Sequence, residues 1–317
     1  MIRNWNEGWL FYRGDDAPVP VCLPHDAMLL EPRDAKCRNG VNSGYFPGGK
    51  YTYEKHFQVS PEDLGQFIAV RFDGVYQNCT VSVNAKRVGN HFYGFTPFEV
   101  DISQAVHVGE NVIRVFVDNS LEPNCRWYTG SGIYRPVQLV TAPKARVQSV
   151  HIDTLNYDPA EVAVTVQTTE PLPVTVEIYG GETLVASGAP GKFCIADAKL
   201  WSAENPYLYT CVVKIATEAR RCTFGIRKLS WSTKTGFLVN GQRVLLRGGC
   251  LHHDHGVLGA CEFWDAQERR LRILKENGFN AVRISHNPAS QITLDLCDRL
   301  GLYVMKEAFD GWDISKT

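Results

Sequence analysis

The sequence predicts a multidomain, mainly β protein in which two β-sandwiches are followed by the first three βα units of a parallel strand–helix barrel. Two observations support this prediction. Up to about residue 229, short runs of alternating apolar and polar residues are separated by clusters of Gly, Pro, Asn and Asp, which is typical of the strands and turns of β-sandwiches. Beyond that point, short apolar runs alternate with helix-like segments, which indicates a parallel sheet.

The first predicted sandwich comprises residues 1–143. Apolar side chains alternate with polar or small ones along 68–72, 79–83 and 113–117. This period of two predicts strands with one buried face. The Gly- and Pro-rich segment 44–49 is predicted to be a loop rather than a strand.

Residues 144–229 are predicted to form a second, smaller sandwich. Valine and isoleucine alternate with other residues in 162–166 and 174–178, and Pro and Gly residues separate the runs. A segment of this length with several short strands suits an immunoglobulin-like sandwich. The Cys-Trp-Cys spacing of antibody domains is not found in the sequence, so the prediction concerns architecture alone.

Residues 230–317 are predicted to open a parallel barrel, with strands at 244–246, 279–284 and 302–305. A complete barrel of eight βα units takes about 250 residues. This part of the sequence is therefore expected to hold an incomplete barrel.

Two helices are predicted between these three strands. Asp265 and Glu268 give the first helix a start that resembles a capping box, and Gly278 marks its end. Ser290 is expected to cap the second helix, and Gly301 to end it.

Composition and charge exclude several classes of function. The 317 residues carry a formal net charge of −1, with 44% hydrophobic and 21% charged residues, which argues against nucleic-acid or membrane binding. Neither a transmembrane segment nor the apolar stretch of a signal peptide is visible, so a cytoplasmic location is expected. The ten scattered cysteines form no C-x-x-C motif and are predicted to be buried, reduced thiols.

Several segments together carry a family resemblance. They are 23–26 (LPHD), 126–135 (RWYTGSGIYR), 200–209 (LWSAENPYLY), 246–254 (LRGGCLHHD), 280–288 (NAVRISHNP) and 295–304 (DLCDRLGLYV). In this order and spacing they resemble glycoside hydrolase family 2, close to its β-galactosidase members. The resemblance implies a sugar-binding-type jelly-roll domain at 1–143, an immunoglobulin-like domain at 144–229, and the N-terminal part of a TIM (β/α)8 barrel at 230–317.

The resemblance also implies an activity and the limits of this chain. The parent protein would be a retaining β-glycosidase that hydrolyses terminal β-galactosides with two carboxylates. The family carries its general acid/base glutamate after strand four of the barrel and its nucleophile after strand seven. Both lie beyond Thr317, so we expect no catalytic residue and no turnover in this chain alone. The alternative is a non-catalytic carbohydrate-binding fragment.

Five candidate substrate-binding residues follow the predicted barrel strands. His252 follows strand one, His286 and Asn287 follow strand two, and Glu307 and Asp310 follow strand three. Because active sites of such barrels form at the carboxyl ends of the strands, these side chains are expected on one rim. The resemblance implies that the two histidines contact sugar hydroxyls.

Two further candidates lie in the first sandwich. Trp127 offers a flat apolar face for stacking on a sugar ring, and Arg126 is a hydrogen-bond donor beside it. Some relatives place a carboxylate close to this point, where this chain has Asn124 and Cys125. The segment 200–209, with its Pro206 turn and its aromatic residues, is expected to be structural.

No cofactor is evident, although the resemblance allows a divalent or sodium ion in the full-length protein. One rival interpretation is a metal site, because His253-x-His255 is similar to the opening of metal-dependent amidohydrolase barrels and imidazole suits zinc. That family completes its site on later strands, so no metal is predicted here. The expected partner is a β-linked sugar. Galactoside, glucuronide and mannoside specificities stay open, as does a homo-oligomeric state.

Overall fold

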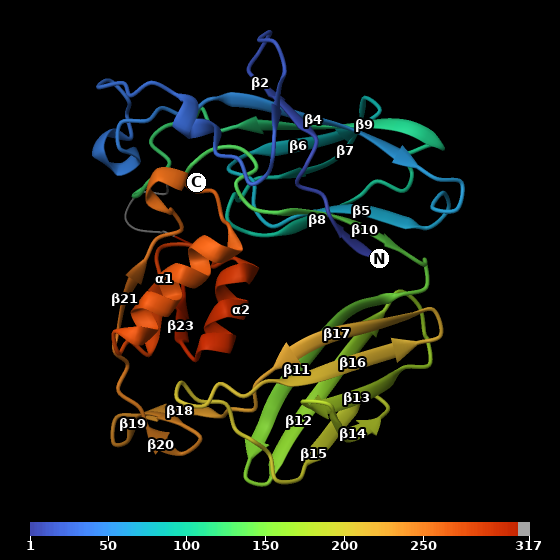
Figure 1. Cartoon of the computed structure of the whole chain (residues 1–317), viewed down its shortest axis with the longest axis vertical. Helices are drawn as coiled ribbons and strands as arrows, with labels where there is room; N and C mark the ends of the chain where they lie inside the picture. Colours follow the sequence, from blue (N-terminus) through green and yellow to red (C-terminus); the bar gives the residue numbers. More distant parts are fainter. Residues whose placement is uncertain (310–317) are drawn as a thin grey trace.

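The computed structural model describes residues 1–309 and arranges them as two antiparallel β-sandwiches and a parallel βα part (Figure 1). The first sandwich packs a six-stranded sheet, in the order β3-β2-β4-β9-β6-β7, on a four-stranded sheet, in the order β1-β10-β5-β8. The six strands are β2 (Trp9–Tyr12), β3 (Val19–Val21), β4 (Lys50–Val59), β6 (Cys79–Val83), β7 (Lys86–His91) and β9 (Gly109–Asp118). The four are β1 (Ile2–Asn4), β5 (Phe67–Phe72), β8 (Phe98–Asp101) and β10 (Val137–Ala142).

The core of the first sandwich confirms the period-two prediction. Val70, Val81 and Val115 lie on three predicted strands and are fully buried, together with Trp9 and Tyr53. The neighbours of Val81 and Val115 along their strands are more exposed, because successive side chains of a strand point to opposite faces. Beside Val70, the small residue Ala69 is buried as well. Two 3-10 helices, η1 (Ala27–Leu30) and η2 (Gly40–Ser43), lie in the long connection between β3 and β4, and segment 44–49 is a loop as predicted.

The second sandwich packs the sheet β11-β12-β15 on the sheet β14-β13-β16-β17. Its strands are β11 (Val147–Tyr157), β12 (Ala160–Thr168), β13 (Thr175–Gly180), β14 (Thr183–Gly188), β15 (Gly191–Ile195), β16 (Tyr209–Ile215) and β17 (Glu218–Phe224). Val162, Val176 and Ile178 come from the predicted alternating runs and are buried in its core. The two runs therefore face each other across the sandwich.

A small antiparallel sheet, which the sequence did not predict, links the second sandwich to the parallel part. It consists of β18 (Leu229–Ser232), β19 (Gly236–Val239) and β20 (Gln242–Arg243). The parallel part follows with the sheet β21-β22-β23. It contains β21 (Gly248–Leu251), η3 (Gly256–Leu258), α1 (Trp264–Glu276), β22 (Ala281–Ile284), α2 (Gln291–Leu300) and β23 (Tyr303–Lys306).

The first parallel strand begins later than predicted. Residues 244–246 are not a strand, and β21 starts at Gly248. The reason is Asn280, whose amide donates to the Leu245 carbonyl oxygen at 3.0 Å and accepts from the Arg247 N–H at 2.7 Å. Ladder pairing starts at Gly248 opposite Ala281, where a Cβ atom would lie only 2.3 Å from the Ala281 oxygen, so glycine permits the close approach.

The two helices agree with their predicted positions, apart from one cap. Ser290 caps α2 by accepting from the Thr293 N–H at 3.1 Å, and Gly301 ends it with a φ of 74°. The capping box at Asp265 is wrong, because the cap position is Phe263 and its side chain makes no capping bond. Asp265 lies instead in the first turn of α1, where a negative charge favours the helix dipole.

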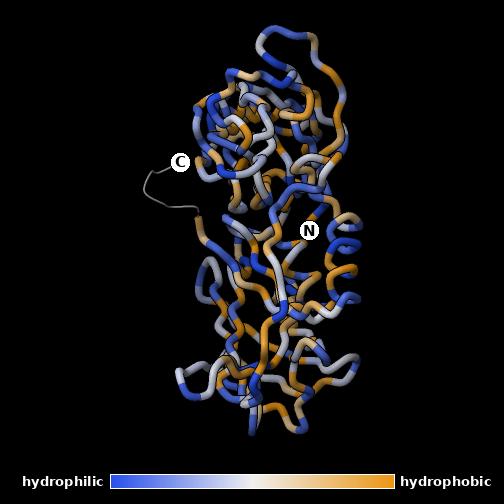
Figure 2. The backbone as a smooth tube through the Cα atoms, turned by 90° about the vertical axis from the view of Figure 1, so that its left-hand side faces the viewer, coloured by the Kyte–Doolittle hydropathy of each residue, from blue (hydrophilic) through white to orange (hydrophobic). Residues whose placement is uncertain are grey.

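The parallel part packs on both sandwiches, and each part of the elongated molecule has its own hydrophobic residues (Figure 2). Trp201 of the second sandwich is buried, donates from Nε1 to the Asp298 carbonyl oxygen at 2.9 Å, and meets the ring of Tyr303 edge-on at 5.4 Å. Lys275 donates to the Ala203 oxygen at 2.6 Å. The segment 200–209 is therefore an interface element, as expected.

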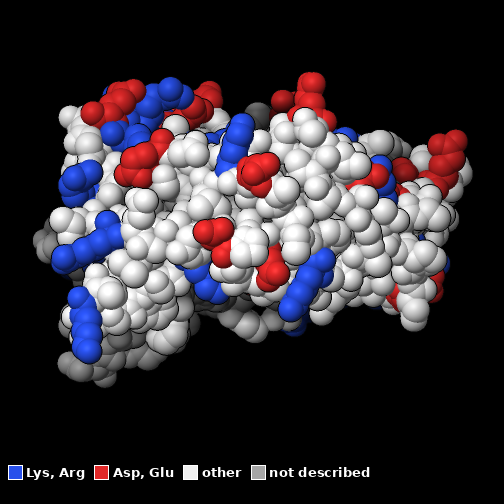
Figure 3. All heavy atoms as spheres, turned by 90° about the horizontal axis from the view of Figure 1, so that it is seen from below, with Lys and Arg blue, Asp and Glu red and all other residues white. Residues whose placement is uncertain are grey.

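The surface and the cysteines bear on the functional classes considered above. On the face shown in Figure 3, basic and acidic side chains are scattered among uncharged residues, which make up most of that face. No helix among residues 1–309 is long and apolar enough to cross a membrane. The cysteines are all free, but the prediction that they are buried holds only in part, because Cys22, Cys194 and Cys250 are exposed.

Candidate functional site

A pocket lies between loops of the first sandwich and the carboxyl ends of β21 and β22. Its lining comes from both parts and consists of Tyr76, Tyr93, Phe95, Asn124, Cys125, Arg126, Trp127, Thr129, His252, His253, His286 and Asn287. Five of the predicted substrate-binding residues are in this set. The first sandwich and the barrel rim, far apart in sequence, thus share one pocket.

Aromatic rings form one wall of the pocket. The Trp127 and His252 rings are stacked, with centroids 4.1 Å apart and planes 13° apart. His286 meets His252 edge-on at 5.3 Å. Because imidazole and indole combine flat apolar faces with polar edges, this wall can both stack against a sugar ring and hydrogen-bond its hydroxyl groups.

The Trp127 side chain is fixed to the barrel rim although it is 47% exposed. Its Nε1 donates to Asp254 Oδ1 at 2.7 Å. Arg270 of α1 in turn donates to the carbonyl oxygens of His252 and Asp254, at 3.0 and 2.8 Å. The Trp127 side chain is therefore fixed by the loop that also carries His252.

His253 is a site residue whose role the sequence did not indicate. Its Nε2 lies 3.0 Å from the Thr129 carbonyl oxygen, so this nitrogen carries the proton and donates. Its ring packs edge-on against Phe95 and Tyr134, and burial lowers its pKa to about 4. Its Nδ1 has no hydrogen-bond partner among the described residues, which leaves a buried acceptor beside the pocket.

His252 is also neutral near pH 7. Burial is the main cause of its lowered pKa, and the neighbouring His286 lowers it further. A neutral imidazole offers one donor and one acceptor nitrogen, which matches the two hydrogen-bonding roles of a sugar hydroxyl. His252 can therefore bind an uncharged polyol without carrying a charge into the pocket.

Glu307 lies behind His286 rather than in the pocket wall. Its Oε2 is 3.5 Å from His286 Nδ1, and its Oε1 accepts from Arg283 Nε at 2.5 Å. Arg283 also donates to the Cys250 sulfur at 3.2 Å. The structure therefore places Glu307 where it orients His286 and is itself held by a guanidinium.

The remaining predicted residues have different outcomes. Asn287 lines the pocket, is 7% exposed, and its Oδ1 has no hydrogen-bond partner within residues 1–309, so it offers a second acceptor. Arg126 lines the same pocket. Asp310 lies outside the described residues.

A buried carboxylate, Asp26, joins the parts that form the pocket. Its Oδ1 accepts from the N–H groups of Met28 and Ser131, at 3.0 and 2.9 Å. Its Oδ2 accepts from the Tyr128 hydroxyl at 2.6 Å and from the Ala260 N–H at 2.9 Å. Burial raises the pKa of Asp26, and these hydrogen bonds oppose that rise. Four donors from three segments thus meet at one side chain.

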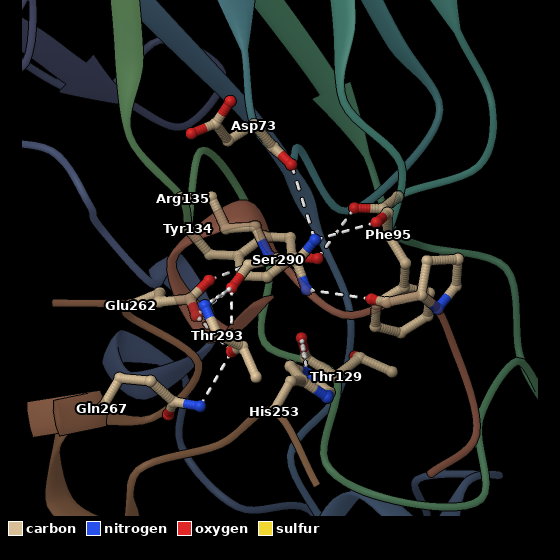
Figure 4. A network of polar contacts seen from close by, with 12 residues as sticks. Asp73, Phe95, Thr129, Tyr134, Arg135, His253, Glu262, Gln267, Ser290 and Thr293 are labelled. Atoms are coloured by element: carbon tan, nitrogen blue, oxygen red, sulfur yellow. Dashed lines mark hydrogen bonds and ion pairs between the residues drawn. The ribbon is translucent and has the colours of Figure 1, made fainter. Parts of the chain in front are cut away.

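A second buried contact joins the first sandwich to the parallel part (Figure 4). Arg135 Nε lies 3.3 Å from Glu262 Oε2, and their side chains are 2% and 6% exposed. Arg135 also donates to the Phe95 carbonyl oxygen at 2.8 Å. Glu262 accepts from the hydroxyls of Ser290 and Thr293 at the start of α2, so the ion pair is connected to the helix that follows β22.

The metal-site alternative gains no support. Among residues 1–309, no group of three or more His, Cys, Asp or Glu side chains is arranged to hold a metal ion. His253 directs Nε2 at a backbone oxygen, while Asp254 Oδ1 accepts from Trp127. The segment 252–255 therefore serves to hold the pocket loops, and no step of a reaction is assigned to a metal here.

Three family models match successive parts of the chain. The model described as "Glycosyl hydrolases family 2, sugar binding domain" matches residues 42–143, the one described as "Glycosyl hydrolases family 2" matches 137–227, and the one described as "Glycosyl hydrolases family 2, TIM barrel domain" matches 232–311. Their order agrees with that of the three structural parts.

Whole-chain comparisons point the same way. The chain is 34% identical to a β-galactosidase of Bacteroides ovatus, across 99% of this chain and 42% of that protein. It superposes on a solved glycosyl hydrolase family 2 member from Bacteroides cellulosilyticus with a TM-score of 0.91 and 36% identity, across 99% of this chain and 46% of that one. A β-glucuronidase from Ruminococcus gnavus gives a TM-score of 0.85 at 25% identity, over 97% and 59%. The chain thus spans less than half of the curated relative.

Proposed function

Since the chain belongs to glycosyl hydrolase family 2, we propose that the whole protein is a retaining β-glycosidase that hydrolyses terminal β-galactosides. Its chemistry would use two carboxylates about 5–5.5 Å apart, one as nucleophile and one as acid/base. Within the described residues this chain contributes the substrate-facing rim, and we assign neither carboxylate to it.

The aromatic wall formed by Trp127, His252 and His286 is the observation that supports this proposal most. A galactoside has an apolar face and several neutral hydroxyl groups. The stacked indole and imidazole at 4.1 Å supply a flat surface, and the neutral His252 supplies a donor and an acceptor. Asn287 and His253 add buried acceptors without partners in the described chain, which sugar hydroxyls would satisfy.

The test compares two lengths of the same protein. The complete reading frame that encodes this chain and the 317-residue chain itself are each assayed with an aryl β-galactoside. We expect hydrolysis by the product of the longer frame and none above background by the 317-residue chain, because positioning alone does not replace the acid/base and nucleophilic steps. A rate that copurifies with the short chain and scales with its concentration would contradict the proposal.

A variant in the longer product tests the site. Trp127→Ala removes the stacking surface, and we expect kcat/KM for the aryl galactoside to fall about 2- to 10-fold, since aromatic contacts contribute about 0.5–1.5 kcal/mol beyond the area that they bury. Trp231→Ala is the matched control, because that side chain is 77% exposed on β18, away from the pocket. Equal effects of the two variants would mean that the pocket is not the sugar site.

A β-glucuronide is the second candidate substrate. Arg126 lines the pocket, and a guanidinium can pair with the carboxylate of a uronic acid. The ratio of kcat/KM for aryl β-glucuronide and aryl β-galactoside separates the two. Arg126→Gln is expected to lower activity on the glucuronide selectively if that is the substrate, and to leave the ratio unchanged if the galactoside is.

The 317-residue chain could also act as a carbohydrate-binding fragment. Titration of the chain with galactose by calorimetry tests this, with Trp127→Ala as the variant expected to lose the signal. Heat from binding that survives this substitution would place the sugar elsewhere.

A further inference from the structure

Two cysteines of the second sandwich lie directly opposite each other on neighbouring strands. Cys211 of β16 pairs with Cys222 of β17 in the antiparallel register. Paired residues of such a ladder have Cα atoms about 4.5–5.5 Å apart and side chains on the same face. Disulfides span Cα separations of about 4.4–6.8 Å. In the described strands, no other cysteine is paired with a cysteine.

The two thiols differ in access and in acidity. Cys211 is fully buried in the core, whereas Cys222 is half-buried at its edge. The Cys222 thiol also approaches the Cys211 carbonyl oxygen at 3.9 Å. A hydrogen bond between the two thiols lowers the pKa of one of them, Cys222, with Arg220 adding to this, and raises the pKa of the other. Because Cys222 is half-buried whereas Cys211 is fully buried, a disulfide in solution reaches Cys222 first.

We propose that Cys211 and Cys222 are a dithiol–disulfide site that a small-molecule disulfide such as glutathione disulfide oxidises in the folded chain. The Cys222 thiolate attacks one sulfur of glutathione disulfide, which forms a mixed disulfide and releases one glutathione thiolate. The Cys211 thiol then attacks the Cys222 sulfur, its proton passes to the departing glutathione thiolate, and the second glutathione is released. Two protein thiols are oxidised to one disulfide, and one glutathione disulfide is reduced to two glutathione molecules.

The bond would join the two strands of one hairpin. β17 also holds the start of β11, because Glu218 accepts from the Val147 N–H at 2.6 Å and Arg220 donates to the Gln148 carbonyl oxygen at 2.9 Å. Oxidation would therefore restrain a strand that fixes the point where the chain enters the second sandwich. This consequence is independent of the sugar pocket and of the proposed hydrolase activity.

Tryptic mapping tests the proposal on the 317-residue chain. The folded chain is incubated with glutathione disulfide, free thiols are alkylated, and the chain is digested. Cleavage after Lys214 and Arg221 places Cys211 in peptide 200–214 and Cys222 in peptide 222–227. We expect these two peptides to be linked, with a mass two hydrogens below the sum of the free thiols. Oxidation should raise the midpoint of thermal unfolding, and dithiothreitol should reverse both changes.

Three variants test the order in which the two cysteines react and the selectivity of the oxidation. Cys211→Ser should trap Cys222 as a mixed disulfide with glutathione, because the second thiol is missing. Cys222→Ser should leave Cys211 reduced. Cys194→Ser is the matched control on the exposed surface of the same sandwich and should keep the linked peptide. The proposal is overturned if Cys211 and Cys222 stay alkylated while Cys194 becomes glutathionylated, or if the link forms only in urea.

Discussion

Removing the charge of Glu262 should weaken the packing of the parallel part on the first sandwich. In the native chain the Arg135 guanidinium is 2% exposed, and Glu262 is its counter-charge at 3.3 Å. Glu262→Gln keeps the shape and an acceptor oxygen for Ser290 and Thr293 but removes the ion-pair partner of the buried guanidinium. Breaking one side of a buried pair costs about 3–5 kcal/mol. We expect the lower end, about 3 kcal/mol, since the amide preserves part of the hydrogen bonding.

Limited trypsin digestion under native conditions measures this change. When opening is fast relative to cleavage, the cleavage rate follows the population of the open form. A change of about 3 kcal/mol raises that population about 100-fold. Early cuts are expected beyond Lys228, where the parallel part begins to separate, with a resistant product that contains the two sandwiches.

Glu268→Gln is the matched control on the same part of the chain. Glu268 pairs with Arg272 one turn along α1, with side chains 31% and 56% exposed, so its loss should cost about 0.3–0.5 kcal/mol. A double-mutant cycle with Arg135→Met adds a second measure, because the double variant should lose less than the sum of the singles. If Glu262→Gln is digested no faster than Glu268→Gln, the ion pair does not hold the two parts together.

Three more outcomes can be checked. Trp201→Ala should cost about 3–5 kcal/mol and expose the parallel part to trypsin, whereas unchanged digestion would show that the second sandwich does not support it. Acidification from pH 6.5 to 4 should lower the midpoint of thermal unfolding, because His25, His253 and His255 have folded pKa values of about 4 and bind protons more readily when unfolded. The stability present at pH 7 is lost as the pH falls through this window, by up to about 3 kcal/mol for His253. A midpoint that does not change with pH would refute this. Elemental analysis should find well under one zinc ion per chain, and a tightly held ion lost on mutating segment 252–255 would reverse the assignment of that segment.

Local patterns were enough to predict both α-helices and several of the strands. Ser290 and Gly301 bound α2 as the sequence indicated, and the valine alternation at 162–166 lies within β12. The late start of β21 could not be predicted, because it depends on the Asn280 side chain bonding to residues 33 and 35 positions earlier. An apolar run does not show that the side-chain amide of a distant residue forms hydrogen bonds with its backbone.

The candidate site, like the fold, could be predicted only where local sequence patterns determine it. The convergence of His252 and His286 follows from their positions after adjacent parallel strands, and the sequence predicted it. The contact between Trp127 and His252 joins residues in different structural parts, so no local pattern in the sequence predicts it. His253 shows no local signal that separates it from its neighbours, since its role depends on the Thr129 oxygen 124 residues away.

The hydrogen bonding of Asp26 has a consequence for synthesis of the chain on the ribosome. Its partner Ala260 is 234 residues further along, so at about 5–20 residues per second it is translated about 10–50 s later. During that interval the carboxylate can already bind Met28, Tyr128 and Ser131, which belong to the first sandwich. The N-terminal sandwich can thus fold with one acceptor position still open to water, and the arriving Ala260 N–H replaces that water when the barrel rim docks.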